Sequence, residues 1–300
     1  MSIFKGLGAI FKKTFKTWMD LDPFREGAVI AYYAIFALPG LLVVVVTVAG
    51  YFFGHEAVTG QVQKQISGAM GEDTAKQVQQ MMASASQSKD SIWATIIGII
   101  SILVGATAVF SALQKSLNNI WNVKADTKKS GILTYLRVRF FSFGLVLSIA
   151  FLLLISLVVS SVLSALSDWV RQHLSDSLLV IFAVLNFIFS LAVITVLFAL
   201  MFKFLPDAKI KWRTIWVGAF VTSLLFTLGK TALGLYFGKA NPASGYGAAG
   251  SIVLILLWTS YSSMIVFFGS VFTKVYNTEH YGEAPPAPYA VKEEQPHKLV

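Results

Sequence analysis

The sequence predicts an all-α polytopic membrane protein with six transmembrane helices, an N-terminal amphipathic surface helix and a short outer helical hairpin. The 300-residue chain is 56% hydrophobic and 13% charged, with a mean hydropathy of +0.69, which is too apolar for an ordinary soluble domain. Its apolar residues gather in runs of about 20, enough to cross roughly 30 Å of hydrocarbon as a helix. These runs lack the alternation of barrel strands, so their backbone groups must be satisfied within helices.

Residues 1–28 are predicted to form an amphipathic helix at the cytoplasmic face. Apolar side chains recur at spacings of three and four, at Phe4, Leu7, Phe11, Phe15 and Trp18. The proposed membrane-surface residues are Lys5, Lys12, Lys13, Lys16 and Trp18. This pattern fits a helix that lies on an anionic membrane surface until Pro23 ends it. The alternative is that the helix packs onto the protein's own cytoplasmic loops.

The membrane domain is predicted over residues 29–276. Its six apolar runs are 29–53, 92–113, 140–166, 178–204, 214–238 and 249–276. Segment 54–91 is more polar, with Val62 and Ile66 spaced by four, a break at Gly71, and then Val78 and Met82. We expect two short amphipathic helices there. Residues 277–300 are rich in proline and charge, which predicts a disordered cytoplasmic tail.

Basic residues indicate the orientation of the chain. The segments on the side of the two termini hold 18 Lys and Arg, whereas those on the other side hold 5. Because Lys and Arg are retained on the cytoplasmic side, we expect both termini in the cytoplasm and segment 54–91 outside.

The residue inventory argues against several kinds of chemistry. None of the 15 acidic residues falls inside a predicted span, which disfavours a proton relay of buried carboxylates. No loop offers a carboxylate or histidine cluster for metal-assisted hydrolysis, and the absence of cysteine excludes thiolate sites. The pI near 9.6 is explained by loop topology rather than by nucleic acid. We therefore expect no enzymatic activity, cofactor, metal or nucleic-acid partner.

Lys230 lies well inside the fifth predicted span, 214–238. The triplet Gly229-Lys230-Thr231 resembles the end of a phosphate-binding loop, but Leu224 stands where such a loop needs a glycine. A small and polar stripe follows at spacings of four, three and four, namely Ser223, Thr227, Lys230 and Gly234. This stripe is expected to face the helix bundle as part of a substrate pathway. Alternatively, Lys230 extends outward to the membrane interface.

Two backbone irregularities supply the other pathway candidates. Pro39, followed by Gly40, predicts a kink or unwinding of the first span, near Tyr32 and Tyr33. The turn GKANPASGYGAAG places Tyr246 and Gly247 at the start of the last span, where helix amino ends attract anions. The structural alternatives are an ordinary proline kink and a compact hairpin of small residues.

Three motifs together resemble the YihY/BrkB family of bacterial inner-membrane proteins. They are AYYAIFALPG at 31–40, ATAVFSALQKSLNNIW at 106–121 and SGYGAAGSIVLILLW at 244–258. The resemblance implies six helices, an inner-membrane location and a transport role, and it carries over no catalytic residue. An older ribonuclease label for this family is not supported, because the chain lacks a nuclease-like carboxylate cluster.

The chain departs from the family pattern at two places. Relatives often have Gly-Ala-Glu in the last span, where this chain has Gly269-Ser270-Val271. The family's Ser-Leu-x-Pro pattern is replaced by Ala37-Leu38-Pro39-Gly40. Val271 therefore cannot perform the acid–base role that a glutamate at this position could perform in relatives.

The expected function is that of a transporter or flippase-like protein for an anionic substrate, with lipids among the candidates. The alternative is a structural or regulatory envelope protein that organises membrane lipids or partners without transport.

Overall fold

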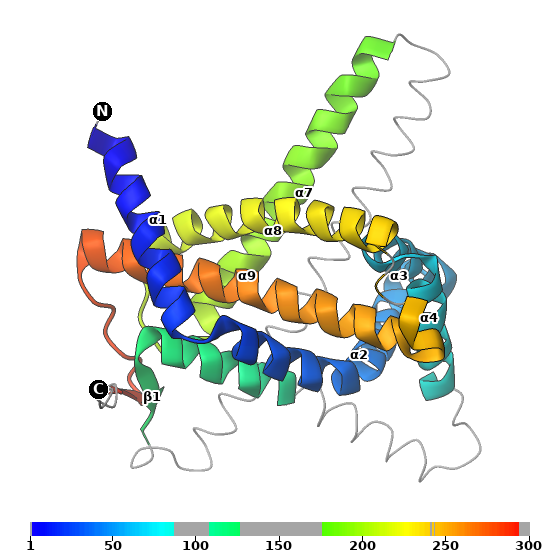
Figure 1. Cartoon of the computed structure of the whole chain (residues 1–300), viewed down its shortest axis with the longest axis horizontal. Helices are drawn as coiled ribbons and strands as arrows, with labels where there is room; N and C mark the ends of the chain where they lie inside the picture. Colours follow the sequence, from blue (N-terminus) through cyan, green and yellow to red (C-terminus); the bar gives the residue numbers. More distant parts are fainter. Residues whose placement is uncertain (1, 87–107, 127–175, 241, 243, 294–300) are drawn as a thin grey trace.

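The structure, a computed structural model, describes residues 2–86, 108–126, 176–240, 242 and 244–293. These residues are mostly helical (Figure 1). The elements are α1 (Ser2–Asp20), α2 (Pro23–Phe53), α3 (His55–Met70), α4 (Glu72–Ser86), β1 (Val123–Ala125), α7 (Asp176–Phe204), α8 (Trp212–Ala240), the 3-10 helix η1 (Ser244–Ala249), α9 (Gly250–Tyr281) and β2 (Ala290–Lys292). Residues 108–121 are also helical and lead into β1.

Three helices in the described part of the chain are long and apolar enough to cross a membrane. They are α8, α9 and the Val184–Phe204 portion of α7. The helix α2 covers the predicted first span and continues as α-helix through Pro39, so the backbone does not unwind there. Most of the predicted second span and all of the third lie outside the described residues. The count of six spans therefore stays a prediction.

Small residues bring α8 and α9 together in an antiparallel pair (Figure 1). A Cβ atom added at Gly218 would lie 1.9 Å from Thr273 Oγ1, and one added at Gly269 would lie 1.9 Å from Thr222 Oγ1. Each threonine hydroxyl donates to the glycine carbonyl one turn earlier in its own helix, at 2.6 Å. Small residues at such spacing permit close helix contact in membranes. On its other side α9 packs against α2, where Gly27 meets Ser260.

The N-terminal helix packs against the C-terminal half of α9. The Phe11 ring lies 5.1 Å from the Phe272 ring, and Trp18 Nε1 donates to the Met264 carbonyl at 3.2 Å. A turn at Leu21 and Asp22 then leads into α2, and Pro23 occupies its first turn. Pro23 therefore begins α2 rather than ending α1, because proline suits the first turn of a helix. The helix thus packs within the protein, but against α9 rather than against the cytoplasmic loops named in the alternative.

Residues 277–293 contradict the predicted disordered tail. The helix α9 continues to Tyr281, and β2 pairs antiparallel with β1. Between them, Lys209 N donates to Pro285 O at 2.8 Å and Ala287 N donates to Asp207 O at 2.9 Å. These backbone hydrogen bonds hold the segment to distant loops. The two-stranded sheet also means that the fold is not purely helical.

The predicted pair of short helices is confirmed as α3 and α4. They are separated at Gly71, whose φ of +91° favours glycine. Val58, Val78 and Met82 are buried, in one cluster with Phe237 of α8 and Leu254 of α9. The pair lies at the end of the molecule opposite α1 and β1 (Figure 1). Its location on the outer side of a membrane stays a prediction.

Candidate functional site

The predicted stripe on α8 divides between the interior and the surface. Ser223 is fully buried, and its Oγ lies 2.7 Å from Thr195 Oγ1 of α7. Thr227 is half-buried and donates to the Ser223 carbonyl at 2.8 Å. Lys230 is exposed, and Gly234 has open space around it. The polar residues thus run along α8 from a buried contact with α7 to an exposed cation.

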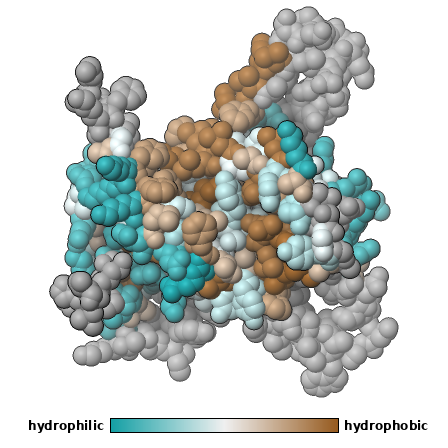
Figure 2. Space-filling model, in the orientation of Figure 1, coloured by the Kyte–Doolittle hydropathy of each residue, from teal (hydrophilic) through white to brown (hydrophobic). Residues whose placement is uncertain are grey.

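The same part of α8 carries exposed apolar side chains on its other faces. Leu228 is 68% exposed, Leu235 59% and Tyr236 51%. No carboxylate in the described part of the chain forms an ion pair with Lys230. Hydrophobic surface also covers α7 and the adjoining part of α8 (Figure 2).

Polar side chains near the end of the 106–121 motif form hydrogen bonds with two carboxylates, and the sequence alone did not reveal these contacts. Asn118 Nδ2 and Gln114 Nε2 donate to the two carboxylate oxygens of Asp207, at 2.7 and 3.2 Å. Asp207 N in turn donates to Asn118 Oδ1 at 2.8 Å. Ser116 Oγ donates to Glu26 Oε2 at 2.7 Å. The motif therefore joins the loop before α8 to the start of α2.

Burial raises the pKa of the Asp207 carboxyl, although hydrogen bonds from Asn118, Gln114 and Tyr289 act in the opposite direction. Sequence reasoning missed this cluster because Asn118 and Asp207 are 89 positions apart. The only local signal was a set of polar side chains, spaced by two and four, at the end of an apolar run.

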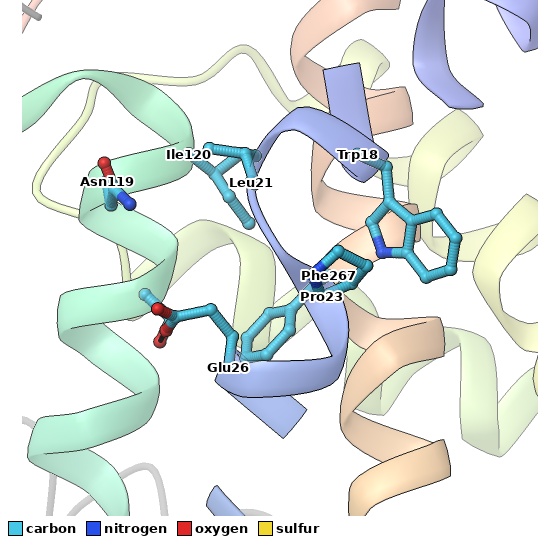
Figure 3. Close-up of a pocket in the computed structure, with 8 residues that line it drawn as sticks. Trp18, Leu21, Pro23, Glu26, Asn119, Ile120 and Phe267 are labelled. Carbon is cyan, nitrogen blue, oxygen red and sulfur yellow. Dashed lines mark hydrogen bonds between the residues drawn. The ribbon is translucent and has the colours of Figure 1, made fainter. Parts of the chain in front are cut away.

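A small crevice lies beside this cluster (Figure 3). Its lining residues are Trp18, Leu21, Pro23, Glu26, Ser116, Asn119, Ile120 and Phe267. Figure 3 shows Glu26 and Asn119 toward the 108–121 helix and Trp18 on the opposite side. The crevice has room for about one water molecule, so it does not accommodate a substrate. It lies where α1, α2, the 108–121 helix and α9 meet.

The remaining pathway candidates lie apart from Lys230. Tyr32 and Tyr33 are exposed on α2, and their rings are 5.5 Å apart. Pro39 lies farther along the same helix, and α9 lies between α2 and α8 in Figure 1. Tyr246 is 60% exposed in η1, which also contains Gly247. The described contacts do not join these residues into one site with Lys230.

The membrane-surface candidates and Val271 occupy different environments. Lys12, Lys13 and Lys16 are exposed on α1, which also carries Lys5, whereas Trp18 is half-buried against α9. Lys13 pairs with Glu279. Val271, which replaces the acid often found in relatives, is fully buried in the apolar core. Within the described segments, no three Asp, Glu or His side chains are grouped to hold a metal.

Comparisons with known proteins place the chain in a family. The sequence profile described as virulence factor BrkB matches residues 14–294. A UPF0761 membrane protein of Saccharophagus degradans is 28% identical over 272 residues, which cover 89% of this chain and 59% of the relative. Another, of Pseudoalteromonas atlantica, is 26% identical over 248 residues, which cover 82% of this chain and 78% of the relative.

A third relative, from Verminephrobacter eiseniae, is 27% identical over 234 residues, or 76% of this chain and 53% of the relative. The chain thus spans little more than half the length of the first and third relatives. No solved structure matches the chain. Since the family profile covers all but the two ends of the sequence, the protein belongs to the virulence factor BrkB family of membrane proteins.

Proposed function

We propose that the protein moves an anionic amphiphile across the membrane, as a transporter or flippase-like protein. The observation that carries this proposal is Lys230, an exposed cation on the apolar helix α8 with no ion-pair partner among the described residues. Ionisable residues within membrane segments are costly, and they commonly mark substrate or ion pathways. A passing anion would neutralise the ammonium group.

The surroundings of Lys230 favour a substrate with an apolar body. Leu228 and Leu235 are exposed on the same helix, where hydrocarbon chains can contact them. The hydroxyl of Thr231, beside Lys230, donates to the Thr227 carbonyl at 3.1 Å and remains exposed. A headgroup and a tail would therefore find polar and apolar contacts within about two turns of α8.

The direct test measures the transfer of labelled phosphatidylglycerol between the leaflets of vesicles that contain the purified protein. Lys230→Met should abolish transfer, whereas Lys230→Arg should retain part of it, because the guanidinium differs from the ammonium in shape and hydration. Lys239→Met is the matched control, since Lys239 is an exposed lysine at the end of the same helix. Full transfer by Lys230→Met at normal expression would reduce Lys230 to an interfacial anchor.

A second candidate is a structural or regulatory role in the envelope. This role is supported by the close packing around α1 and the 108–121 helix. The crevice between them has room for only about one water molecule, which is too small for a substrate. In that case, vesicles with the wild-type protein would transfer no labelled anionic or zwitterionic lipid. Lipids would still bind at the protein surface.

A further inference from the structure

The connection between α7 and α8 carries a basic and aromatic surface that the sequence analysis did not single out. We define the α7–α8 corner as residues 203–216. Three of its aromatic side chains are largely exposed, with Phe204 at 52%, Trp212 at 44% and Trp216 at 46%. Three of its cations are also exposed, namely Lys209, Lys211 and Arg213.

Contacts within the corner hold its aromatic residues in place. Lys203 Nζ donates to the Ile210 carbonyl at 2.7 Å and lies 5.4 Å from the centre of the Trp212 ring. The Trp212 ring in turn lies 6.3 Å from Phe204 and 6.4 Å from Trp216. A cation over an indole face is an attractive contact. The aromatic side chains of the corner are therefore held in position by contacts within the protein.

Helix stability does not explain the cations. Lys211 precedes α8 and Arg213 lies in its first turn, which contains no acidic residue. Positive charge at this end opposes the helix macrodipole. The nearby carboxylate of Asp207 is buried and bound by Asn118 and Gln114, so it does not pair with these side chains. Among the described residues the cations of the corner form no ion pair, and Lys211 Nζ lies 4.3 Å from the centre of the Tyr281 ring.

We propose that the α7–α8 corner binds the headgroups of anionic phospholipids. Tryptophan favours the membrane–water interface, and cations near an anionic leaflet are attracted to it. The corner joins two helices that are long and apolar enough to span, so it lies where such a helix leaves the hydrocarbon. This binding is independent of transport and uses residues outside α1.

The test uses the full chain in vesicles, with brominated phosphatidylglycerol or brominated phosphatidylcholine as the quencher. The signal is the part of the tryptophan fluorescence that Trp216→Phe removes. In the wild type, phosphatidylglycerol should quench this part more strongly than phosphatidylcholine. Lys209→Gln combined with Arg213→Gln should reduce that preference on the order of tenfold, and salt should weaken it in the wild type.

Matched controls separate this surface from the rest of the protein. Lys64→Gln combined with Lys239→Gln removes the same charge from exposed positions at the other end of the helices, and should leave the preference unchanged. Lys209→Arg combined with Arg213→Lys keeps the charge and should preserve most of the preference. Lys12→Gln combined with Lys16→Gln tests α1 alone.

Three results would overturn the proposal. One is an unchanged preference for phosphatidylglycerol when Lys209→Gln and Arg213→Gln are combined and circular dichroism shows that this variant is folded. Another is an equal loss in the control that alters Lys64 and Lys239, which would make the effect one of net charge. The third is a loss confined to the α1 variant. Equally strong, corner-dependent binding of RNA at the same ionic strength would replace the lipid assignment with a general anion surface.

Discussion

At the scale of single residues, Gly218 and Gly269 determine how closely α8 approaches α9. A methyl group at either position would overlap a threonine hydroxyl at 1.9 Å. We expect Gly218→Ala and Gly269→Ala each to destabilise the protein by about 1 to 3 kcal/mol, the usual penalty for overpacking a core. Thermal unfolding of the purified protein in detergent measures this effect. Adding Thr273→Ala to Gly218→Ala should recover part of the loss.

Gly234 provides the matched control on the same helix. A Cβ atom there meets no other atom within 4 Å. Gly234→Ala should therefore be neutral or slightly stabilising, since alanine favours helix by up to about 1 kcal/mol. Equal melting temperatures for Gly218→Ala and Gly234→Ala would show that the contact between α8 and α9 tolerates a methyl group, and would contradict the prediction.

The residue scale is also where sequence reasoning reached its limit. The stripe from Ser223 to Gly234 follows from helical spacing, but spacing alone does not give the rotation of α8. The structure buries Ser223 against Thr195 and leaves Lys230 exposed. The pair of hydrogen bonds between Asn118 and Asp207 was not predictable, because it depends on how two distant segments of the chain meet.

At the scale of elements, long apolar runs and glycine breaks were sufficient to predict α2, α3, α4, α7, α8 and α9 among the described residues. The helix α7 begins within two residues of its predicted start, and Gly71 separates α3 from α4 as expected. The strand β2 was missed because three residues carry no periodic signal, and its partner β1 lies more than 160 positions earlier. Proline and charge in that region suggested disorder, whereas backbone pairing orders residues 282–293.

This element yields a truncation prediction. Removing residues 283–300 should loosen the β1 segment, because β1 loses its partner strand and Asp207 O loses the hydrogen bond from Ala287 N. Removing only residues 294–300 should leave the protection of residues 122–126 unchanged. Limited proteolysis at residues 122–126, followed by mass spectrometry, provides the measurement. Equal protection of this segment in both truncations would show that β2 contributes nothing to its order.

At the scale of the whole molecule, the structure gathers the segments that the charge count assigned to one side. The helix α1 contacts α9 near Glu279, β1 pairs with β2, and the loop before α8 contacts Pro285. The segments that the charge count gives to that side hold 18 basic residues. Retention of positive charge then predicts a cytoplasmic position for this whole end.

Reporter fusions in a bacterial host test that orientation. Alkaline phosphatase, which is active only outside the cytoplasm, should be inactive after Val300 and active when inserted at Gly71. A green fluorescent protein at the same two sites should give the reverse pattern. Phosphatase activity after Val300 would invert the topology and would place α3 and α4 in the cytoplasm.

The pairing of β1 with β2 also sets an order of events during synthesis. After β1 leaves the ribosome, the chain must still produce α7, α8 and α9 before β2 exists. At about 5 to 20 residues per second, this delay lasts roughly 10 to 30 seconds. An unpaired strand is a template for wrong partners, and lysine on an edge is a common protection. Lys124 is exposed at the centre of β1. Its charge is expected to disfavour pairing of the nascent β1 with other strands until β2 has been synthesised.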